Sequence, residues 1–152
     1  MKVDIFNRLQ ATNLLPIPNT AIISISRPND RACLMPGWEE VLFVEFDDAL
    51  PGEDEGLVLF TSLMAEHIKE FVRNNLDRDF IIHCDAGISR SVAIGVWMMN
   101  IFNASITTHA IHTIRHANVH VLVLLMKSEW IDHFKDRFKG EFNHLFPLNK
   151  EN

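Results

Sequence analysis

The stretch of sequence that decides the fold is Phe80-Ile81-Ile82-His83-Cys84-Asp85-Ala86-Gly87-Ile88-Ser89-Arg90-Ser91. Its first residues favour a β-strand that ends near Cys84, and small residues follow it. The apolar run 92–99 then favours a helix that begins near Arg90. The sequence therefore predicts a strand–loop–helix unit, with one cysteine at the end of the strand and one arginine at the start of the helix.

This loop is predicted to bind an anion. Backbone N–H groups of a tight strand-to-helix loop converge on one point, and Arg90 offers a fork of donors for two oxygens. Gly87 is expected to supply a positive φ or room for close backbone approach. The same field stabilises a thiolate at Cys84, which could attack a bound phosphoryl group and form a cysteinyl-phosphate. Ser91 could then donate a hydrogen bond to the departing sulfur. The alternative is a buried structural cysteine.

The pattern His83-Cys84-x-x-Gly87-x-x-Arg90-Ser91 resembles the signature of the cysteine-dependent protein tyrosine phosphatases, specifically their small dual-specificity branch. The resemblance is strong at the motif and looser over the rest of residues 20–137. It implies that Cys84 is the nucleophile, Arg90 the phosphate clamp and Ser91 the group that assists thiolate departure, while His83 supports the loop. The implied phosphate-binding loop is Cys84, Asp85, Ala86, Gly87, Ile88, Ser89 and Arg90. No metal and no cofactor are expected, and phosphate or vanadate should bind as site ligands.

A carboxylic acid is also needed, because an alkoxide or phenoxide leaves slowly unless it is protonated. The resemblance places this acid on a loop after an earlier strand. Residues 40–46 are predicted to be that strand, and Asp47 and Asp48 follow it directly. The pattern Phe46-x-Asp48 fits the family best, so the acid is assigned to Asp48, with Asp47 and Asp54 as alternatives. The acidic, Pro- and Gly-containing segment 49–56 is predicted to be a surface loop.

The chain as a whole is predicted to be α/β, with a central, mostly parallel sheet flanked by helices. Strands are expected over 3–6, 21–26, 40–46 and 79–83, and an amphipathic helix over 57–76. Three further helices are expected over 90–102, 107–117 and 119–137, with Ser105 capping the second and Gly140 ending the third. This order puts the site at the carboxyl ends of parallel strands.

Composition agrees with one catalytic domain. The 152 residues, 47% of them apolar, can bury one substantial core, so residues 1–140 are expected to form a single domain, with 141–152 as a loosely held tail. The net charge of −6, with no basic tract, argues against a nucleic-acid partner. The chain shows no apolar run that could span a membrane and no signal peptide at its start, so a cytoplasmic location is expected. Cys33 is expected to be a loop cysteine, with a disulfide to oxidised Cys84 as the lesser alternative.

Four histidines fall at spacings of three, four and four, namely His109, His112, His116 and His120. A continuous helix would line them along one face, where they could bind zinc or nickel. No cysteine or carboxylate accompanies them, so a polar, partly exposed face is the preferred interpretation.

The substrate is expected to be a phosphorylated protein or peptide. The loop carries Asp85 and no basic residue besides Arg90, which disfavours highly anionic lipid headgroups and triphosphorylated RNA ends. The chain contains no tyrosine, so the tyrosine-bearing recognition loop of strict phosphotyrosine enzymes is absent. A shallower site that accepts phosphotyrosine is expected, with phosphoserine and phosphothreonine left open. The alternative function is a slow or silent phosphate-binding module; the sequence does not indicate an oligomeric state.

Overall fold

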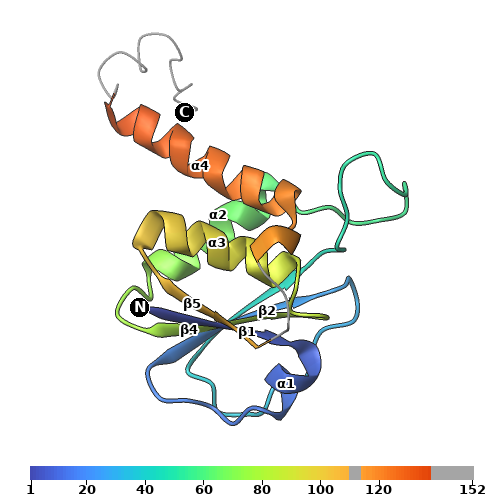
Figure 1. Ribbon diagram of the computed structural model, residues 1–152, viewed down its shortest axis with the longest axis vertical. Helices are drawn as coiled ribbons and strands as arrows, with labels where there is room; N and C mark the ends of the chain where they lie inside the picture. The colour runs from blue at the N-terminus through green and yellow to red at the C-terminus, as the bar shows by residue number, and fades with distance from the viewer. Residues whose placement is uncertain (110–113, 138–152) are drawn as a thin grey trace, which may run out of the picture.

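The computed structural model describes residues 1–109 and 114–137, which are built around one five-stranded sheet (Figure 1). In chain order, the elements are β1 (Lys2–Asn7), α1 (Arg8–Asn13), β2 (Thr20–Ser26), β3 (Glu40–Glu45), α2 (Ser62–Arg73), β4 (Asp79–Cys84), α3 (Arg90–Phe102), β5 (Ser105–Thr108), the 3₁₀ turn η1 (Ile114–His116) and α4 (Val119–Arg137). The strand order is β3-β2-β4-β1-β5, and every neighbouring pair is parallel. The predicted α/β class with a central parallel sheet is confirmed.

Strand β4 lies at the centre of the sheet. Its residues from Phe80 to Cys84 are all buried, which fits a parallel strand covered on both faces. It pairs with β1 up to Asn7↔Cys84 and with β2 up to Ser24↔His83. The central position therefore holds Cys84 at the carboxyl edge, with the ends of β1 and β2 on either side.

Helices α2, α3 and α4 cover one face of the sheet, and α1 lies on the other face (Figure 1). The face under the three helices carries the main core; its largest fully buried side chains include Trp97, Phe46, Phe80, Ile5, Ile23, Ile68 and Ile82. Helix α2 is shorter than the predicted helix 57–76. The hydroxyl of Thr61 accepts a hydrogen bond from the Met64 N–H and caps the helix, so the residues before it remain in the loop.

The predicted helix over 107–117 is wrong at its start, and Ser105 is not a helix cap. Residues Ser105–Thr108 instead form β5, which pairs with β1 from Lys2↔Ser105 to Ile5↔Thr108. The β-branched residues Ile106, Thr107 and Thr108 favour a strand over a helix. Asn103, in the left-handed conformation with φ 54°, ends α3 and turns the chain toward the sheet edge.

Helix α4 is held to the rest of the molecule by apolar and charged contacts. Val121 and Leu125 are fully buried in the core. Lys69 of α2 is buried, and its Nζ lies 2.7 Å from Asp132 Oδ2 and 3.1 Å from Glu66 Oε1. Burial opposes the charge on Lys69, but the hydrogen bonds to these two carboxylates outweigh that effect and raise its pKa. This anchoring matters for the site because α4 begins directly after Asn118.

No helix within residues 1–109 and 114–137 combines the length and the apolar character that a membrane crossing requires. Gly140, which was expected to end the last helix, and the segment 141–152 lie outside the described residues.

Candidate active site

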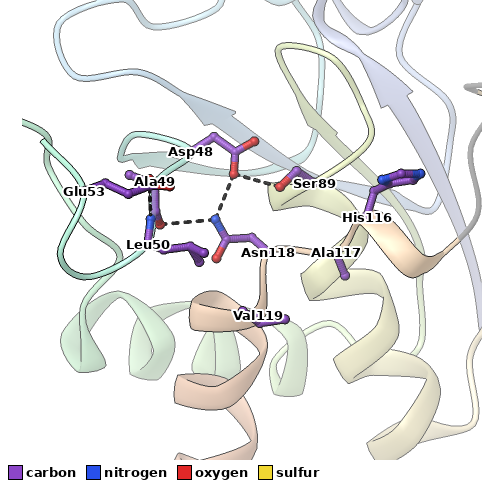
Figure 2. A pocket seen from close by; sticks show the side chains of 9 residues that line it. All are labelled: Asp48, Ala49, Leu50, Glu53, Ser89, His116, Ala117, Asn118 and Val119. Atoms are coloured by element: carbon purple, nitrogen blue, oxygen red, sulfur yellow. Dashed lines mark hydrogen bonds between the residues drawn. The ribbon is translucent and has the colours of Figure 1, made fainter.

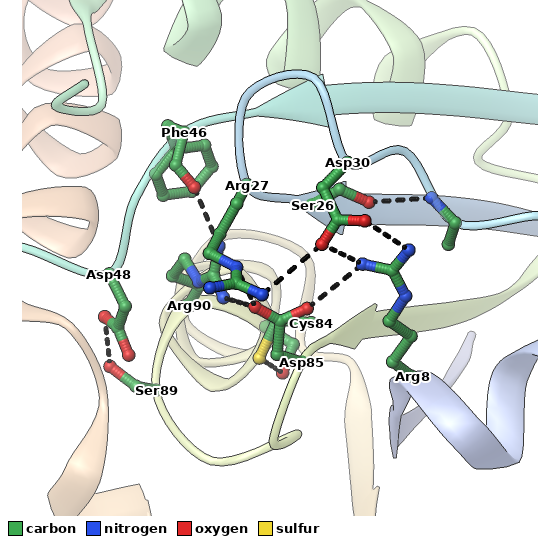
Figure 3. Close-up of polar contacts among 12 residues, drawn as sticks. Arg8, Ser26, Arg27, Asp30, Phe46, Asp48, Cys84, Asp85, Ser89 and Arg90 are labelled. Atoms are coloured by element: carbon green, nitrogen blue, oxygen red, sulfur yellow. Dashed lines mark hydrogen bonds and ion pairs between the residues drawn. The ribbon is translucent and has the colours of Figure 1, made fainter. Parts of the chain in front are cut away.

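The cysteine loop connects the carboxyl end of β4 to the amino end of α3, as the sequence predicted. The Cys84 side chain, drawn in Figure 3, is buried, and one backbone N–H and one hydroxyl group lie close to its sulfur. The Gly87 N–H donates to Sγ at 3.3 Å, and the Ser91 hydroxyl oxygen lies 3.1 Å from Sγ. Both groups are placed to donate a hydrogen bond to a thiolate at this position.

Gly87 meets both requirements that the sequence left open. Its φ is +69°, and a Cβ at this position would lie 2.7 Å from the carbonyl carbon and oxygen of Phe6 and 2.8 Å from the backbone nitrogen of Asn7. The loop therefore passes directly against the end of β1, where only glycine fits.

The amino end of α3 is free of a side-chain cap. Ser89 occupies the cap position, but its hydroxyl donates to Asp48 Oδ1 at 2.7 Å and makes no capping bond to the helix. The first N–H groups of α3 therefore have no acceptor from their own cap residue. A helix start of this kind, next to a buried sulfur, suits a bound oxyanion.

Arg90 is 3% exposed and is held at two of its nitrogens. Nη1 donates to the Phe46 carbonyl at 2.7 Å, and Nη2 donates to Asp85 Oδ2 at 2.8 Å. Its Nε is buried and has no hydrogen-bond partner among the described residues. A fixed guanidinium with one unsatisfied buried donor is suited to an anionic ligand, because the ligand would satisfy that donor.

His83 lies beneath the loop and is fully buried. Its Nε2 is 2.7 Å from the Ser24 hydroxyl of the neighbouring strand β2. Burial lowers the pKa of His83 from 6.5 to about 4, although the Cys84 backbone acts in the opposite direction. His83 is therefore neutral near neutrality, so it can support the loop through packing and hydrogen bonding but does not offer a positive charge to the thiolate.

Asp85 joins the cysteine loop to two arginines that lie outside it (Figure 3). Besides Arg90, its carboxylate lies 3.5 Å from Arg8 Nη1 and 3.6 Å from Arg27 Nε. Burial alone would raise the pKa of Asp85, but the hydrogen bond and the charge of Arg90, together with Arg27 and Arg8, lower it. Asp30 accepts hydrogen bonds from both terminal nitrogens of Arg8, at 3.0 and 3.2 Å, and so joins this group of charged side chains. The negative charge that Asp85 gives the loop is thus compensated.

Of the three candidate acids, Asp48 is the one that the structure places against the cysteine loop. Its Oδ1 accepts from the Ser89 hydroxyl and from Asn118 Nδ2 at 2.8 Å (Figure 2). Asn118 also donates its backbone N–H to the Ser89 carbonyl, and its Oδ1 accepts from the Val121 N–H, which caps α4. One asparagine therefore ties the Asp48 loop, the cysteine loop and α4 together.

Asp47 and Asp54 are placed differently. Asp47 Oδ2 accepts from the Val58 N–H at 2.8 Å, so its carboxylate closes the base of the acidic loop. Asp54 is exposed within that loop, in the turn before Leu57. Residues 50–57 are exposed, as expected for a surface loop.

A hollow of about 360 Å³ lies beside Asp48 (Figure 2). Its lining is Asp48, Ala49, Leu50, Glu53, Ser89, His116, Ala117, Asn118 and Val119. It gives a substrate room beside both the candidate acid and the cysteine loop.

Three residues of this region were not assigned from the sequence, although the position of each in the sequence could have indicated its place. Asn118 falls between the helices predicted over 107–117 and 119–137, and asparagine before an apolar helical run is typical of an N-cap. Arg8 and Arg27 come directly after β1 and β2. The carboxyl ends of parallel strands meet at one edge, so both arginines could have been placed beside Cys84.

The three histidines of this series that the structure describes, His109, His116 and His120, do not share a helix face. His109 follows β5, stacks on Phe6 and contacts Asp4, while His120 lies on α4 and contacts the Phe60 carbonyl. His116 lies in η1 beside the hollow, and His112 lies outside the described residues. In the part of the chain that the structure describes, no three His, Cys, Asp or Glu side chains are arranged to hold a metal ion. Cys33 is exposed in the loop after β2.

No model of a known protein family matches the chain, and no curated protein matches it. Among solved structures, the human tyrosine phosphatase-like serine/threonine/tyrosine-interacting protein is similar, with a TM-score of 0.49 and 20% sequence identity, over 75% of this chain and 78% of that chain.

Proposed function

We propose that the chain is a cysteine-dependent phosphatase that hydrolyses phosphomonoesters through a cysteinyl-phosphate. The observation that carries this proposal is the convergence of the Gly87 N–H and the Ser91 hydroxyl on the buried Cys84 sulfur. Arg90, at the end of the same loop, supplies a fixed positive charge with one unsatisfied donor. A structural cysteine would need none of these groups.

In the first step, the phosphoryl group binds to the loop N–H groups and Arg90, and the Cys84 thiolate attacks phosphorus. An S–P bond forms as the P–O bond to the leaving group breaks, and Asp48 in its protonated form gives its proton to the leaving oxygen. Arg90 and the backbone N–H groups stabilise the equatorial oxygens of the transition state.

In the second step, Asp48 takes a proton from a water molecule as that water attacks phosphorus. The S–P bond breaks, its electron pair returns to Cys84, and phosphate leaves. Ser91 can donate a hydrogen bond to the departing thiolate, because its hydroxyl already lies 3.1 Å from the sulfur. Asn118 and Ser89 orient Asp48 for both transfers.

We infer that the substrate is a phosphorylated protein or peptide. Phosphotyrosine is the first candidate for the phosphorylated residue, and phosphoserine and phosphothreonine are further candidates. The exposure of Asp48 and the open hollow beside it support a shallow site. A nucleophilic thiolate also requires a reducing compartment, which supports a cytoplasmic location. We further propose that residues 1–140 act as one catalytic domain.

The second candidate function is a phosphate-binding module with little or no turnover. Two contacts favour it. Asp48 Oδ1 already accepts two hydrogen bonds, and Nη2 of Arg90 is occupied by Asp85. While these contacts are kept, Asp48 has one oxygen fewer, and Arg90 one donor fewer, to offer to a substrate.

Turnover of para-nitrophenyl phosphate separates the two candidates. An enzyme should hydrolyse it without added metal and be inhibited competitively by vanadate, while Cys84→Ser should abolish activity. Arg90→Lys should lose most turnover, because an ammonium group cannot reproduce the two-point contact of a guanidinium. Activity that survives Cys84→Ser, or that disappears with a chelator, contradicts the proposal.

A further inference from the structure

A second hollow lies next to the charged cluster of Arg8, Arg27, Asp30 and Asp85, and Arg27 and Asp30 belong to its lining. It measures about 590 Å³ and is lined by Arg27, Pro28, Asn29, Asp30, Asp47, Gly56, Leu57 and Val58. Leu57 and Val58 are 39% and 42% exposed, so the hollow has an apolar wall facing a charged rim. The proposed catalytic steps make no use of this region.

Three contacts fix the rim of this hollow to the cysteine loop. The Arg8 N–H donates to the Asp85 carbonyl at 3.1 Å, which continues the β1–β4 pairing past Cys84. The Arg8 guanidinium in turn holds both carboxylate oxygens of Asp30. Asp30 also closes the turn that carries Arg27, because its N–H donates to the Arg27 carbonyl at 3.1 Å. The turn therefore has a defined position relative to the nucleophile.

Arg27 is the loosely held member of the cluster. Its side chain is 63% exposed, against 28% for Arg8. Its two ion-pair distances, 3.4 Å to Asp30 and 3.6 Å to Asp85, are longer than those of Arg8 to Asp30 and of Arg90 to Asp85. Both of its partners keep a closer arginine when Arg27 moves away. The guanidinium can therefore turn to a new anion at little cost.

We propose that Arg27 and this hollow form a recognition site for an acidic side chain next to the phosphorylated residue of a peptide substrate. This inference rests on the proposed phosphatase function and names the substrate class for the same site. While the phosphoryl group occupies the cysteine loop, the flanking segment lies in the hollow, with its carboxylate on Arg27 and its apolar groups on Leu57 and Val58.

The charges of the cluster favour a peptide with one extra carboxylate over a polyanionic headgroup. Arg8 and Arg27 are balanced by Asp30 and Asp85, so Arg90 supplies the surplus positive charge that the phosphoryl group requires. Asp47 also lines the hollow, so a headgroup with several phosphates would meet three carboxylates, those of Asp30, Asp47 and Asp85, without further cations. To bind a single carboxylate, only the exposed Arg27 has to exchange its contacts with Asp30 and Asp85 for a contact with the peptide.

The test measures peptide binding, so that its outcome does not depend on turnover. Fluorescent phosphotyrosine peptides with glutamate or glutamine at the flanking positions are titrated against full-length Cys84→Ser protein, and affinity is followed by anisotropy. The glutamate peptide should bind between about two- and fivefold more tightly at low salt, which is the size of an exposed ion pair, and salt should reduce this preference. Adding Arg27→Ala should reduce the ratio to one, and Arg27→Lys should keep part of it.

Arg31→Ala is the matched control. Arg31 lies near Arg27 in the chain, its side chain is 55% exposed, and it forms an ion pair with Glu45; neither residue lines the hollow. This variant should keep the glutamate preference. The proposal is overturned if the preference is absent, if it survives Arg27→Ala, if Arg31→Ala removes it equally, or if the peptides do not bind. It is also overturned if Arg27→Ala weakens binding of an inositol bisphosphate while leaving the peptide ratio unchanged. Hydrolysis of para-nitrophenyl phosphate by the unmodified chain reports separately on the proposed function.

Discussion

Replacing Gly87 by alanine should both destabilise the fold and disrupt the anion site. Two costs add at this position. A left-handed backbone costs a residue with a Cβ roughly 1–2 kcal/mol, and forcing extra atoms into a packed region costs about 1–3 kcal/mol more. The new Cβ would meet the backbone of Phe6 and Asn7 at 2.7–2.8 Å. These are strand residues paired with His83 and Cys84, so they cannot turn aside as a flexible side chain could.

Gly52→Ala is the matched control for this substitution. Gly52 also has a positive φ, +91°, but a Cβ there would have nothing within 4 Å. It should therefore lose only the backbone part, about 1–2 kcal/mol, while Gly87→Ala should lose about 2–5 kcal/mol in the free energy of unfolding. Urea denaturation followed by circular dichroism measures both values, and vanadate titration measures the site.

The result that would refute this reasoning is a Gly87→Ala protein as stable as Gly52→Ala, within about 0.5 kcal/mol, with unchanged vanadate affinity. It would mean that the loop can move away from the end of β1 without harm, and that the close approach of Gly87 does not define the cradle.

Two further predictions concern the acid and the buried histidine. Asp48→Asn should slow hydrolysis of phosphotyrosine far more than that of an activated aryl phosphate and should flatten the alkaline limb of the pH profile, because a poor leaving group depends most on the acid. If Asp54→Asn gives this pattern and Asp48→Asn does not, the acid is misassigned. Neutral His83 should make the fold acid-sensitive. Because the folded pKa of His83 is lowered from 6.5 to about 4, the stability linked to it is fully present above pH 6.5 and falls as the pH drops toward 4, by up to about 3 kcal/mol. In His83→Gln, which can still bond Ser24, the free energy of unfolding should fall less over this range, and parallel profiles for the two proteins would show that His83 is not responsible.

The central unit of the fold could be predicted because its signals are local. The apolar strand before Cys84, the glycine at position 87 and the apolar helix after Arg90 lie within a few turns of each other, and each agrees with the next. Placing Asp48 beside the cysteine loop depended on a further prediction. It required the prediction that the strand before it runs parallel to β4, so that both loops emerge at the same edge of the sheet.

The parts that the sequence did not predict depend on pairing between distant segments. The four residues of β5 are too short to show a clear alternation, and Ser105 suggested a helix cap; pairing with β1 decided their structure. Likewise, the contacts of Asp85 with Arg8 and Arg27 come from three strands that end side by side. Asn118 acquires its role from the position of α4, which a buried lysine on α2 helps to fix.

The most direct test of the central claim is to detect the covalent intermediate on Cys84. Ser91→Ala protein is mixed with para-nitrophenyl phosphate, quenched in acid within the first turnover and examined by intact-protein and peptide mass spectrometry. Without the Ser91 hydroxyl to stabilise the departing thiolate, the second step should slow more than the first, so one phosphoryl group should accumulate on the peptide that contains Cys84. Release of nitrophenol without any phosphorylated enzyme, or phosphorylation of a residue other than Cys84, would contradict the account.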